Sequence, residues 1–169
     1  MRSSLALIGL PASGKTSVGR ILAGFLGLAF ADLDAELEAE AGMPVASIFR
    51  LEGESGFRAR ESAALSRLSG AGPLVLATGG GCVESAANRA LLAGQFFTVW
   101  LRASPTVCAA RSASAPPGSR PLLAGDALSV MEALLSRREA WYRDCAKLTV
   151  EADLLGPEEL AEAIRDAIR

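Results

Sequence analysis

A glycine-rich segment that ends in a lysine and a threonine carries the strongest chemical signal in this 169-residue sequence. Residues 9–16 read GLPASGKT, a full match to G-x-x-x-x-G-K-[ST], and they lie between an apolar run and a segment of helical period. In such loops backbone N–H groups turn inward around phosphate oxygens, and the next helix adds its positive dipole end. The pattern predicts binding of ATP or GTP, with the Lys15 charge on the β- and γ-phosphates and the Thr16 hydroxyl as a ligand of Mg²⁺.

Two aspartates, Asp32 and Asp34, follow the second apolar run. Side chains at i and i+2 of an extended chain point the same way, so both carboxylates would face one site. Beside a phosphate loop, one carboxylate is expected near the metal and the other near the acceptor hydroxyl. The alternative is a helix N-cap, because Asp34 precedes a segment of helical period.

A charged and aromatic face follows Gly53. Glu54, Phe57, Arg58 and Glu61 are spaced i, i+3, i+4 and i+7, so a helix would carry them on one face. This spacing is typical of a solvated face of salt bridges. The phenylalanine favours a half-buried face instead, in which Arg58 lines the site.

Two further segments give weaker signals on their own. Three glycines, residues 79–81, follow Thr78 and a short apolar run, where bare N–H groups can meet an anion or let a ring approach the backbone. The same run is equally typical of a plain loop. The pair Arg137-Arg138 falls on the longest expected helix, where paired arginines are usually at the surface.

A long Ser/Pro/Gly-rich stretch carries Arg120 and is preceded by Arg111. A flexible loop with an arginine beside a phosphate site predicts a mobile lid, over about residues 111–125, that closes on the γ-phosphate. The alternative is a solvated loop charge. Arginines around the site indicate that the acceptor carries an anion, which is either a carboxylate or a phosphate. Asp34 favours the carboxylate, because it would repel a phosphate dianion and suits a neutral hydroxyl.

Composition excludes several classes of protein. The chain has no histidine, which removes Ser-His-Asp and Cys-His catalysis and every His-ligated metal site. Its net charge of −2 argues against a general nucleic-acid binder, and its three scattered cysteines argue against a disulfide framework. No apolar run approaches the roughly 20 residues of a membrane span. We therefore expect a soluble, cytoplasmic protein with a single domain over residues 1–169.

Short apolar runs alternate with longer segments of helical period, which predicts an α/β fold with a mainly parallel, five-stranded sheet. Ligands of such sheets lie beyond the carboxyl ends of the strands, so the polar segments after the first three strands should share one crevice. Strands are expected at residues 5–10, 28–33, 74–77, 96–101 and 148–150. Helices are expected at residues 16–26, 34–41, 45–50, 54–68, 85–93, 105–110, 127–146 and 157–168.

Six segments together resemble the shikimate kinases, in that family's order and close to its spacing. They are GLPASGKTSVGR, DLD followed by AGMPVASIF, GESGFRARE, ATGGGCV, RPLLAG and RREAWYRDCA. The resemblance covers nearly the whole chain. It implies a nucleoside-monophosphate-kinase-like P-loop fold, in which helices flank a five-stranded parallel sheet in three layers and a lid loop moves. The implied reaction transfers the γ-phosphate of ATP to the 3-hydroxyl of shikimate.

The resemblance also implies roles by motif position, with Lys15, Asp34 and Arg120 catalytic and a substrate-binding region over about residues 32–61. Mg²⁺ would be held by Thr16 directly and by Asp32 through water. Shikimate would contact Asp34, Arg58, Gly79, Gly80, Gly81 and Arg138. ATP would contact Gly9, Pro11, Ala12, Ser13, Gly14, Lys15, Thr16, Ser17, Arg111 and Arg120.

The implied partners are the small molecules ATP and shikimate, bound by a monomer that uses no nucleic acid or membrane. Pro11 and Ser13 are uncommon in the family's phosphate loop, and the lid segment looks lengthened by Pro116-Pro117. The sequence leaves two alternatives open. One is a gluconate-type sugar-acid kinase, which also uses a serine-rich loop, and the other is an inactive, ATP-binding regulatory module.

Overall fold

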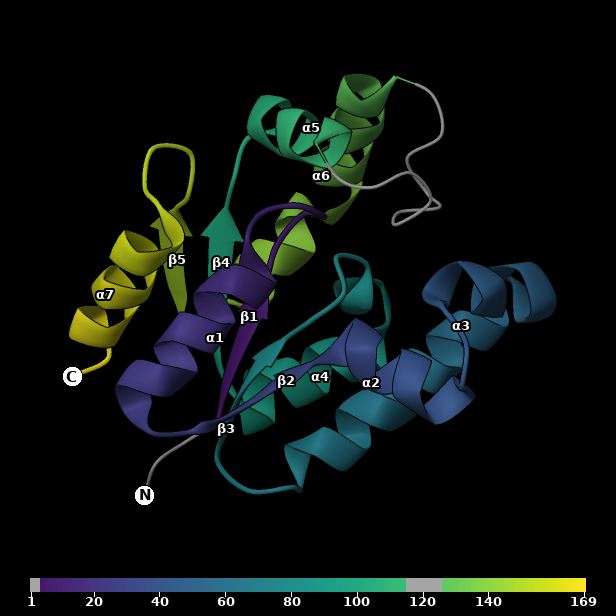
Figure 1. The fold of residues 1–169 in the computed structure, drawn as a ribbon, viewed down its shortest axis with the longest axis horizontal. Helices are drawn as coiled ribbons and strands as arrows, with labels where there is room; N and C mark the ends of the chain where they lie inside the picture. Colours follow the sequence, from purple (N-terminus) through teal and green to yellow (C-terminus); the bar gives the residue numbers. More distant parts are fainter. Residues whose placement is uncertain (1–3, 115–125) are drawn as a thin grey trace.

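A five-stranded parallel sheet runs through the protein, with helices on both of its faces (Figure 1). The structure, a computed structural model, describes residues 4–114 and 126–169. The strand order is β2-β3-β1-β4-β5, and every pairing is parallel. The strands are β1 (Leu5–Ile8), β2 (Ala29–Asp32), β3 (Leu74–Ala77), β4 (Phe97–Arg102) and β5 (Leu148–Glu151).

The helices form two layers around this sheet. Helices α1 and α7 pack against each other on one face, and α3, α4 and α6 follow one another on the other (Figure 1). Among the described residues, no helix has both the length and the apolar character needed to cross a membrane. The helices are α1 (Lys15–Leu26), α2 (Leu33–Ala41), α3 (Val45–Ser69), the 3₁₀ turn η1 (Cys82–Glu84), α4 (Ala86–Gln95), α5 (Pro105–Ala113), α6 (Ala127–Cys145) and α7 (Pro157–Ala167).

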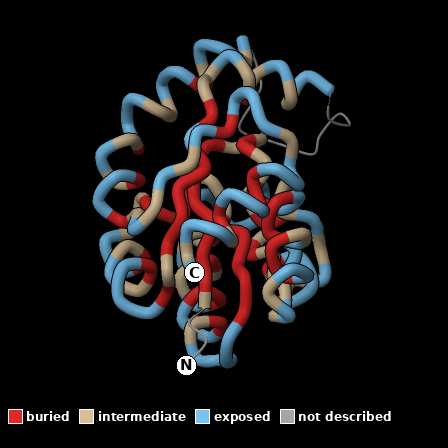
Figure 2. The backbone as a smooth tube through the Cα atoms, turned by 90° about the vertical axis from the view of Figure 1, so that its left-hand side faces the viewer, coloured by how far each residue is buried: buried red, intermediate tan, exposed pale blue. Residues whose placement is uncertain are grey.

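The hydrophobic core lies along the central strands, where Figure 2 shows the buried backbone running through the middle of the molecule. Every residue of β1 and of β3 is buried, as expected for strands covered on both faces. The edge strand β5 instead alternates partly buried and exposed residues. The continuous apolar runs in the sequence therefore mark the centre of the sheet.

The expected α/β fold with five parallel strands is confirmed, with small differences in the bounds of its elements. The two helices expected at 45–50 and 54–68 adjoin each other within α3, which has non-helical backbone angles at Gly53 (φ 71°, ψ −177°). The turn η1 was not expected from the sequence. Most of the lid segment, including Arg120 and Pro116-Pro117, lies outside the described residues.

Strand β1 ends at Ile8, two residues earlier than expected, because the chain turns at Gly9. Gly9 has a φ of 145°, which side chains rarely adopt. A Cβ atom at this position would lie 2.6 Å from the Leu101 carbonyl oxygen of β4 and 3.0 Å from Ser13 Oγ. Close packing of the phosphate loop on β4 therefore requires a glycine.

The substitution Gly9→Ala should lower the free energy of unfolding by about 2 kcal/mol or more, because it adds backbone strain to a clash with main chain. Urea unfolding followed by circular dichroism measures this change. Gly24→Ala is the matched control, since Gly24 is an exposed residue of α1 where an added Cβ atom would meet open space. It should leave stability unchanged or raise it by about 0.5–1 kcal/mol. Equal effects of the two variants would contradict this account of Gly9.

Candidate active site

A cavity of about 650 Å³ opens at the carboxyl ends of β1, β2 and β3. The segments that follow these three strands all line it, as expected for ligand sites of parallel sheets. Gly9 and Ser13 lie in the phosphate loop but not on the cavity wall, and Arg120 lies outside the described residues. The expected site residues that line the cavity are Pro11, Ala12, Gly14, Lys15, Thr16, Ser17, Asp32, Asp34, Arg58, Gly79, Gly80, Gly81, Arg111 and Arg138.

The phosphate loop brings the start of α1 to the cavity. Gly14, with a φ of 99°, precedes the first residue of α1, and no side chain caps this helix end. The first-turn N–H groups are thus available to an anion. Lys15 Nζ donates to the carbonyl oxygens of Gly9 (2.9 Å) and Leu10 (2.7 Å), so its ammonium group lies over the loop. The loop therefore combines backbone donors with one buried positive charge.

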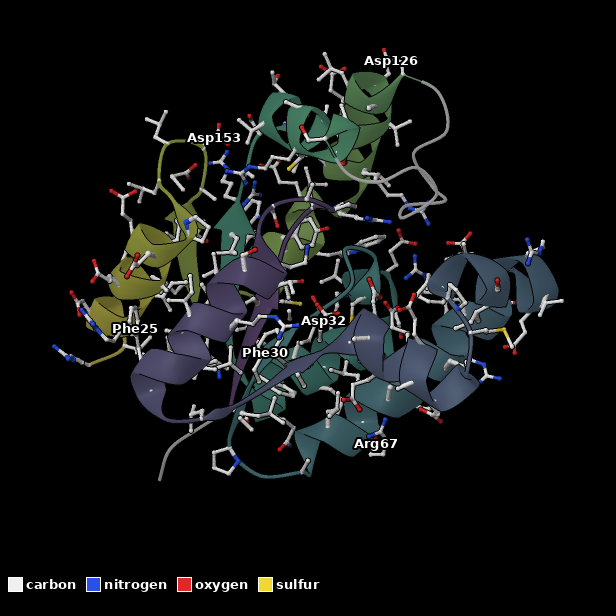
Figure 3. All side chains as sticks on the ribbon, in the orientation of Figure 1. Phe25, Phe30, Asp32, Arg67, Asp126 and Asp153 are labelled. Atoms are coloured by element: carbon white, nitrogen blue, oxygen red, sulfur yellow. The ribbon has the colours of Figure 1, made fainter. Side chains whose placement is uncertain are left out.

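Asp32 lies where β2 passes into α2 (Figure 3), and its carboxylate meets the Thr16 hydroxyl of α1. Thr16 Oγ1 donates to Asp32 Oδ2 at 2.6 Å, and Asp32 Oδ1 accepts from the backbone N–H groups of Asp34 (3.1 Å) and Ala35 (3.3 Å). Asp32 is therefore the N-cap of α2, and the alternative that assigned the cap to Asp34 is wrong. The extended-chain argument for the aspartate pair is also wrong, because α2 begins at Leu33.

Asp34 lies in the first turn of α2 and lines the cavity. Burial raises the pKa of its carboxyl group, and the nearby Asp32 carboxylate raises it further, while Lys15 and Arg58 oppose the shift. A Cβ atom on Gly79 would lie 3.2 Å from Asp34 Oδ1, so the carboxyl group lies close to the glycine segment. A carboxyl group with a raised pKa inside a cavity is suited to accept a proton from a bound hydroxyl.

Arg58 enters the same cavity from α3, held by a buried carboxylate. Its Nη1 donates to Glu61 Oε2 at 2.9 Å, and its Nη2 lies 3.7 Å from Glu54 Oε1. Phe57 and Glu61 are buried, whereas Glu54 is exposed. The interpretation as a half-buried face is therefore confirmed. Glu61 was not predicted as a site residue, although its i+3 spacing from Arg58 was a usable signal.

A second arginine, Arg138, reaches the cavity from α6. Its guanidinium donates through Nε to Glu84 Oε1 at 2.8 Å, and it is almost fully buried. One turn later, the Tyr142 hydroxyl donates to the Gly80 carbonyl oxygen at 2.6 Å. Burial raises the pKa of Tyr142, so this hydroxyl stays a donor. The expectation of a surface pair holds for the exposed Arg137 but not for Arg138. Glu84 was not predicted as a site residue, because no pattern near it in the sequence indicates a contact with Arg138.

Side chains of α3 and of the phosphate loop press against the glycine segment. A Cβ atom on Gly79 would lie 2.9 Å from Glu61 Oε1, and one on Gly80 would lie 2.8 Å from Pro11 Cδ. At Gly81 it would collide with the guanidinium of Arg58. The plain-loop alternative does not explain these approaches. The glycines let the phosphate loop and α3 come close to the same stretch of backbone.

Arg111 connects the phosphate loop to the residue that follows the edge strand β5. Its Nη1 donates to the Ser13 carbonyl oxygen at 3.4 Å, and its Nη2 donates to the Ala152 carbonyl oxygen at 3.2 Å. Ala152 directly follows β5. The side chain thus lies at the edge of the cavity beside the phosphate loop.

Comparison with known proteins identifies the family. Residues 11–169 match the family model described as shikimate kinase. The shikimate kinase of Thiobacillus denitrificans is 42% identical over 151 residues, which cover 89% of this chain and 81% of that protein. The chain belongs to the shikimate kinase family. The shikimate kinase of Symbiobacterium thermophilum is 38% identical over 167 residues, which cover 98% of this chain and 96% of that protein.

A solved structure agrees with this assignment. The shikimate kinase of Acinetobacter baumannii in complex with shikimate superposes with a TM-score of 0.94 at 36% identity, covering 98% of this chain and 92% of that one. The resemblance to shikimate kinases and the implied P-loop fold are therefore confirmed, and ATP is the co-substrate that this kinase family implies.

Glu61 gives this shikimate kinase family member a carboxyl group with a strongly shifted pKa. Burial raises the pKa of Glu61 from 4.5 to about 7, although the Arg58 guanidinium acts in the opposite direction. Between these two pH values, the folded protein keeps a proton that the unfolded chain releases. The contribution of Glu61 to the free energy of unfolding therefore falls as the pH rises from about 4.5 to about 7.

The variant Glu61→Gln should lack this contribution, since its side chain does not titrate. The wild-type free energy of unfolding, relative to that of the variant, should fall across the window with a slope of at most about 1.4 kcal/mol per pH unit. Urea titrations from about pH 4.5 to about pH 8 measure it. Asp34 contributes a slope of the same sign to both proteins, and the exposed Glu54→Gln should keep the wild-type slope. A constant difference between wild type and Glu61→Gln would contradict the shift.

Proposed function

We propose that this chain transfers the γ-phosphate of ATP to the 3-hydroxyl of shikimate, giving shikimate 3-phosphate and ADP. One observation carries the proposal. A phosphate loop, a carboxyl group with a raised pKa and two arginines line one cavity in a chain of the shikimate kinase family. Phosphoryl transfer depends on positioning and charge neutralisation, for which these groups are suited, and it needs no histidine.

The phosphate loop supports binding of ATP at one end of the cavity. Its backbone N–H groups and Lys15 would hold the β- and γ-phosphates, and Arg111 would pack against the adenine at the cavity edge. Residues 111–125 would act as the lid, from which Arg120 would reach the transferred phosphate. The roles of the lid and of Arg120 rest on the sequence resemblance.

Thr16 and Asp32 fit a Mg²⁺ ion that binds with ATP. Mg²⁺ prefers hard oxygen ligands and is usually held by one or two protein groups together with phosphates and water. A hydroxyl and a carboxylate oxygen 2.6 Å apart on the cavity wall provide such a pair. The bound ion would neutralise charge on the β- and γ-phosphates. Thr16 would bind it directly, and Asp32 would orient Thr16 and contact the ion through water.

Arg58 and Arg138 support recognition of the shikimate carboxylate at the other end of the cavity. Guanidinium groups pair with carboxylates through parallel N–H donors. Asp34 would accept hydrogen bonds from the ring hydroxyls and take the proton of the attacking one. Gly79, Gly80 and Gly81 would line the ring, since their lack of side chains leaves the backbone accessible to it.

Measurement of ADP release, with ATP and Mg²⁺ and with or without shikimate, tests this proposal. We expect a strong dependence on shikimate. Asp34→Asn should lower kcat by about a hundredfold or more through loss of the proton acceptor. Arg58→Ala should raise the KM for shikimate by about tenfold or more through loss of a charged hydrogen-bond donor. Arg60→Ala is the matched control, because Arg60 lies on the same helix but pairs with Glu52 outside the cavity, and it should behave as wild type.

A rate that stays at background with shikimate would overturn the proposal. Gluconate and nucleoside monophosphates would then be tested as acceptors in the same assay. Turnover of gluconate would identify the sugar-acid kinase alternative, and no turnover with any acceptor would leave the regulatory, ATP-binding module.

We also propose that residues 1–169 act as one kinase domain and that the protein is a cytoplasmic monomer. Its three cysteines are free and buried, which suits a reducing compartment. The exposed large apolar side chains of the described residues are scattered over several elements: Phe25, Leu51, Leu128, Leu154 and Leu155. Light scattering in solution should therefore give a mass near 17.5 kDa, and a value of twice that would contradict the monomer.

A further inference from the structure

Glu84, the last residue of η1, lies behind Arg138 and joins it to the surface. Glu84 Oε1 accepts from Arg138 Nε at 2.8 Å and lies 2.7 Å from Arg138 Nη2, while Oε2 accepts from Arg137 Nη2 at 2.8 Å. The exposed fraction of the side chain is 11% for Glu84, 3% for Arg138 and 60% for Arg137. Glu84 thus connects an arginine on the cavity wall to one on the outer surface.

This contact determines which edge of Arg138 remains for a ligand. A guanidinium offers its donors in a rigid planar fork, with one edge formed by Nε and Nη2 and another by Nη1 and Nη2. Glu84 contacts the Nε–Nη2 edge. Glu84 takes only Nη2 of the Nη1–Nη2 edge, and the Tyr142 hydroxyl also lies beside the guanidinium, so this second edge is the one that can face a carboxylate in the cavity that Arg138 lines.

Glu84 itself is held by surrounding contacts. Its backbone N–H donates to the Gly81 carbonyl oxygen at 3.0 Å, and its carbonyl oxygen accepts from Arg89 Nη1 at 3.1 Å. The same Arg89 nitrogen donates to the Val83 carbonyl oxygen, and the Arg89 guanidinium lies over the Trp141 ring of α6. The carboxylate is thus presented to α6 from a fixed turn.

We propose that Glu84 is a positioning residue for recognition of the acceptor's carboxylate. Glu84 fixes the long Arg138 side chain so that the Nη1–Nη2 edge of the guanidinium faces the carboxylate of the ligand. This inference rests on the proposed function. A purely electrostatic role would have the opposite sign, because removal of a negative charge beside Arg138 would strengthen binding of an anion. The positioning role therefore predicts weaker binding when Glu84 is lost, and the electrostatic role predicts tighter binding.

Steady-state kinetics of Glu84→Ala and Glu84→Gln test the proposal. Glu84→Ala should raise the KM for shikimate about tenfold, while kcat and the KM for ATP stay within about twofold, as expected when binding alone is lost. Glu84→Gln keeps the shape and one accepting oxygen, so it should give a smaller increase and remain informative if the alanine variant fails to fold. Glu139→Ala is the control, since Glu139 lies on α6 and pairs with Arg102 and Arg143 away from the cavity.

A second measurement asks whether Glu84 acts through Arg138. In an Arg138→Lys background the planar fork is gone, so adding Glu84→Gln should change the KM for shikimate by less than about twofold. The proposal would be overturned if the fold-change in KM of the double variant equalled the product of the fold-changes of Arg138→Lys and Glu84→Gln. An unchanged or lower KM in the Glu84 single variants would also overturn it. Wild type is measured in the same assay. Failure of wild type to use shikimate would overturn the proposed function, whereas normal wild-type turnover with unaffected Glu84 variants would overturn only this inference.

Discussion

Parallel pairing of β1 with β3 on one side and β4 on the other is the constraint on which the site depends. Leu7 pairs with Ala77, Ile8 with Trp100, and Asp32 with the same Ala77 from the other side of β3. Because the strands run in one direction and stop at nearly the same level, the segments that follow them meet above a single edge. The phosphate loop, the aspartate pair and the glycine segment are distant in sequence, and this register alone brings them to one cavity.

Each of the two arginines proposed to bind the acceptor is backed by a carboxylate on its own or a neighbouring element. Glu61 pairs with Arg58, and Glu84 pairs with Arg138. Partly buried charges are costly unless they are paired and hydrogen-bonded, so the pairs compensate for the burial that a small cavity imposes. When all four groups are ionised, the formal charges within each pair cancel. The direction of the arginine donors would then matter more for binding a carboxylate than the net charge of the two pairs.

The sequence predicted the features that are encoded locally. The phosphate loop, the buried strands and the break at Gly53 all follow from short local patterns. The argument that put both aspartates on one face of an extended chain failed because nothing in the sequence distinguishes a helix that starts at Leu33 from one that starts a residue later. The Arg138–Glu84 contact spans 54 residues and depends on how α6 crosses the sheet, which no local pattern encodes. Arg111 meets the phosphate loop across an even longer gap in the chain.

The crowding at residues 79–81 limits how this segment can drift during evolution. Each of its three positions is crowded by a different side chain, by Glu61, Pro11 and Arg58 in turn. A mutation that introduces a side chain here must push aside Glu61 or Arg58 of α3, or shift Pro11 of the phosphate loop, and all three of these residues line the same cavity. Single-step paths away from three glycines therefore pass through variants with a displaced cavity-lining side chain, so purifying selection should act on this loop more strongly than its short length suggests.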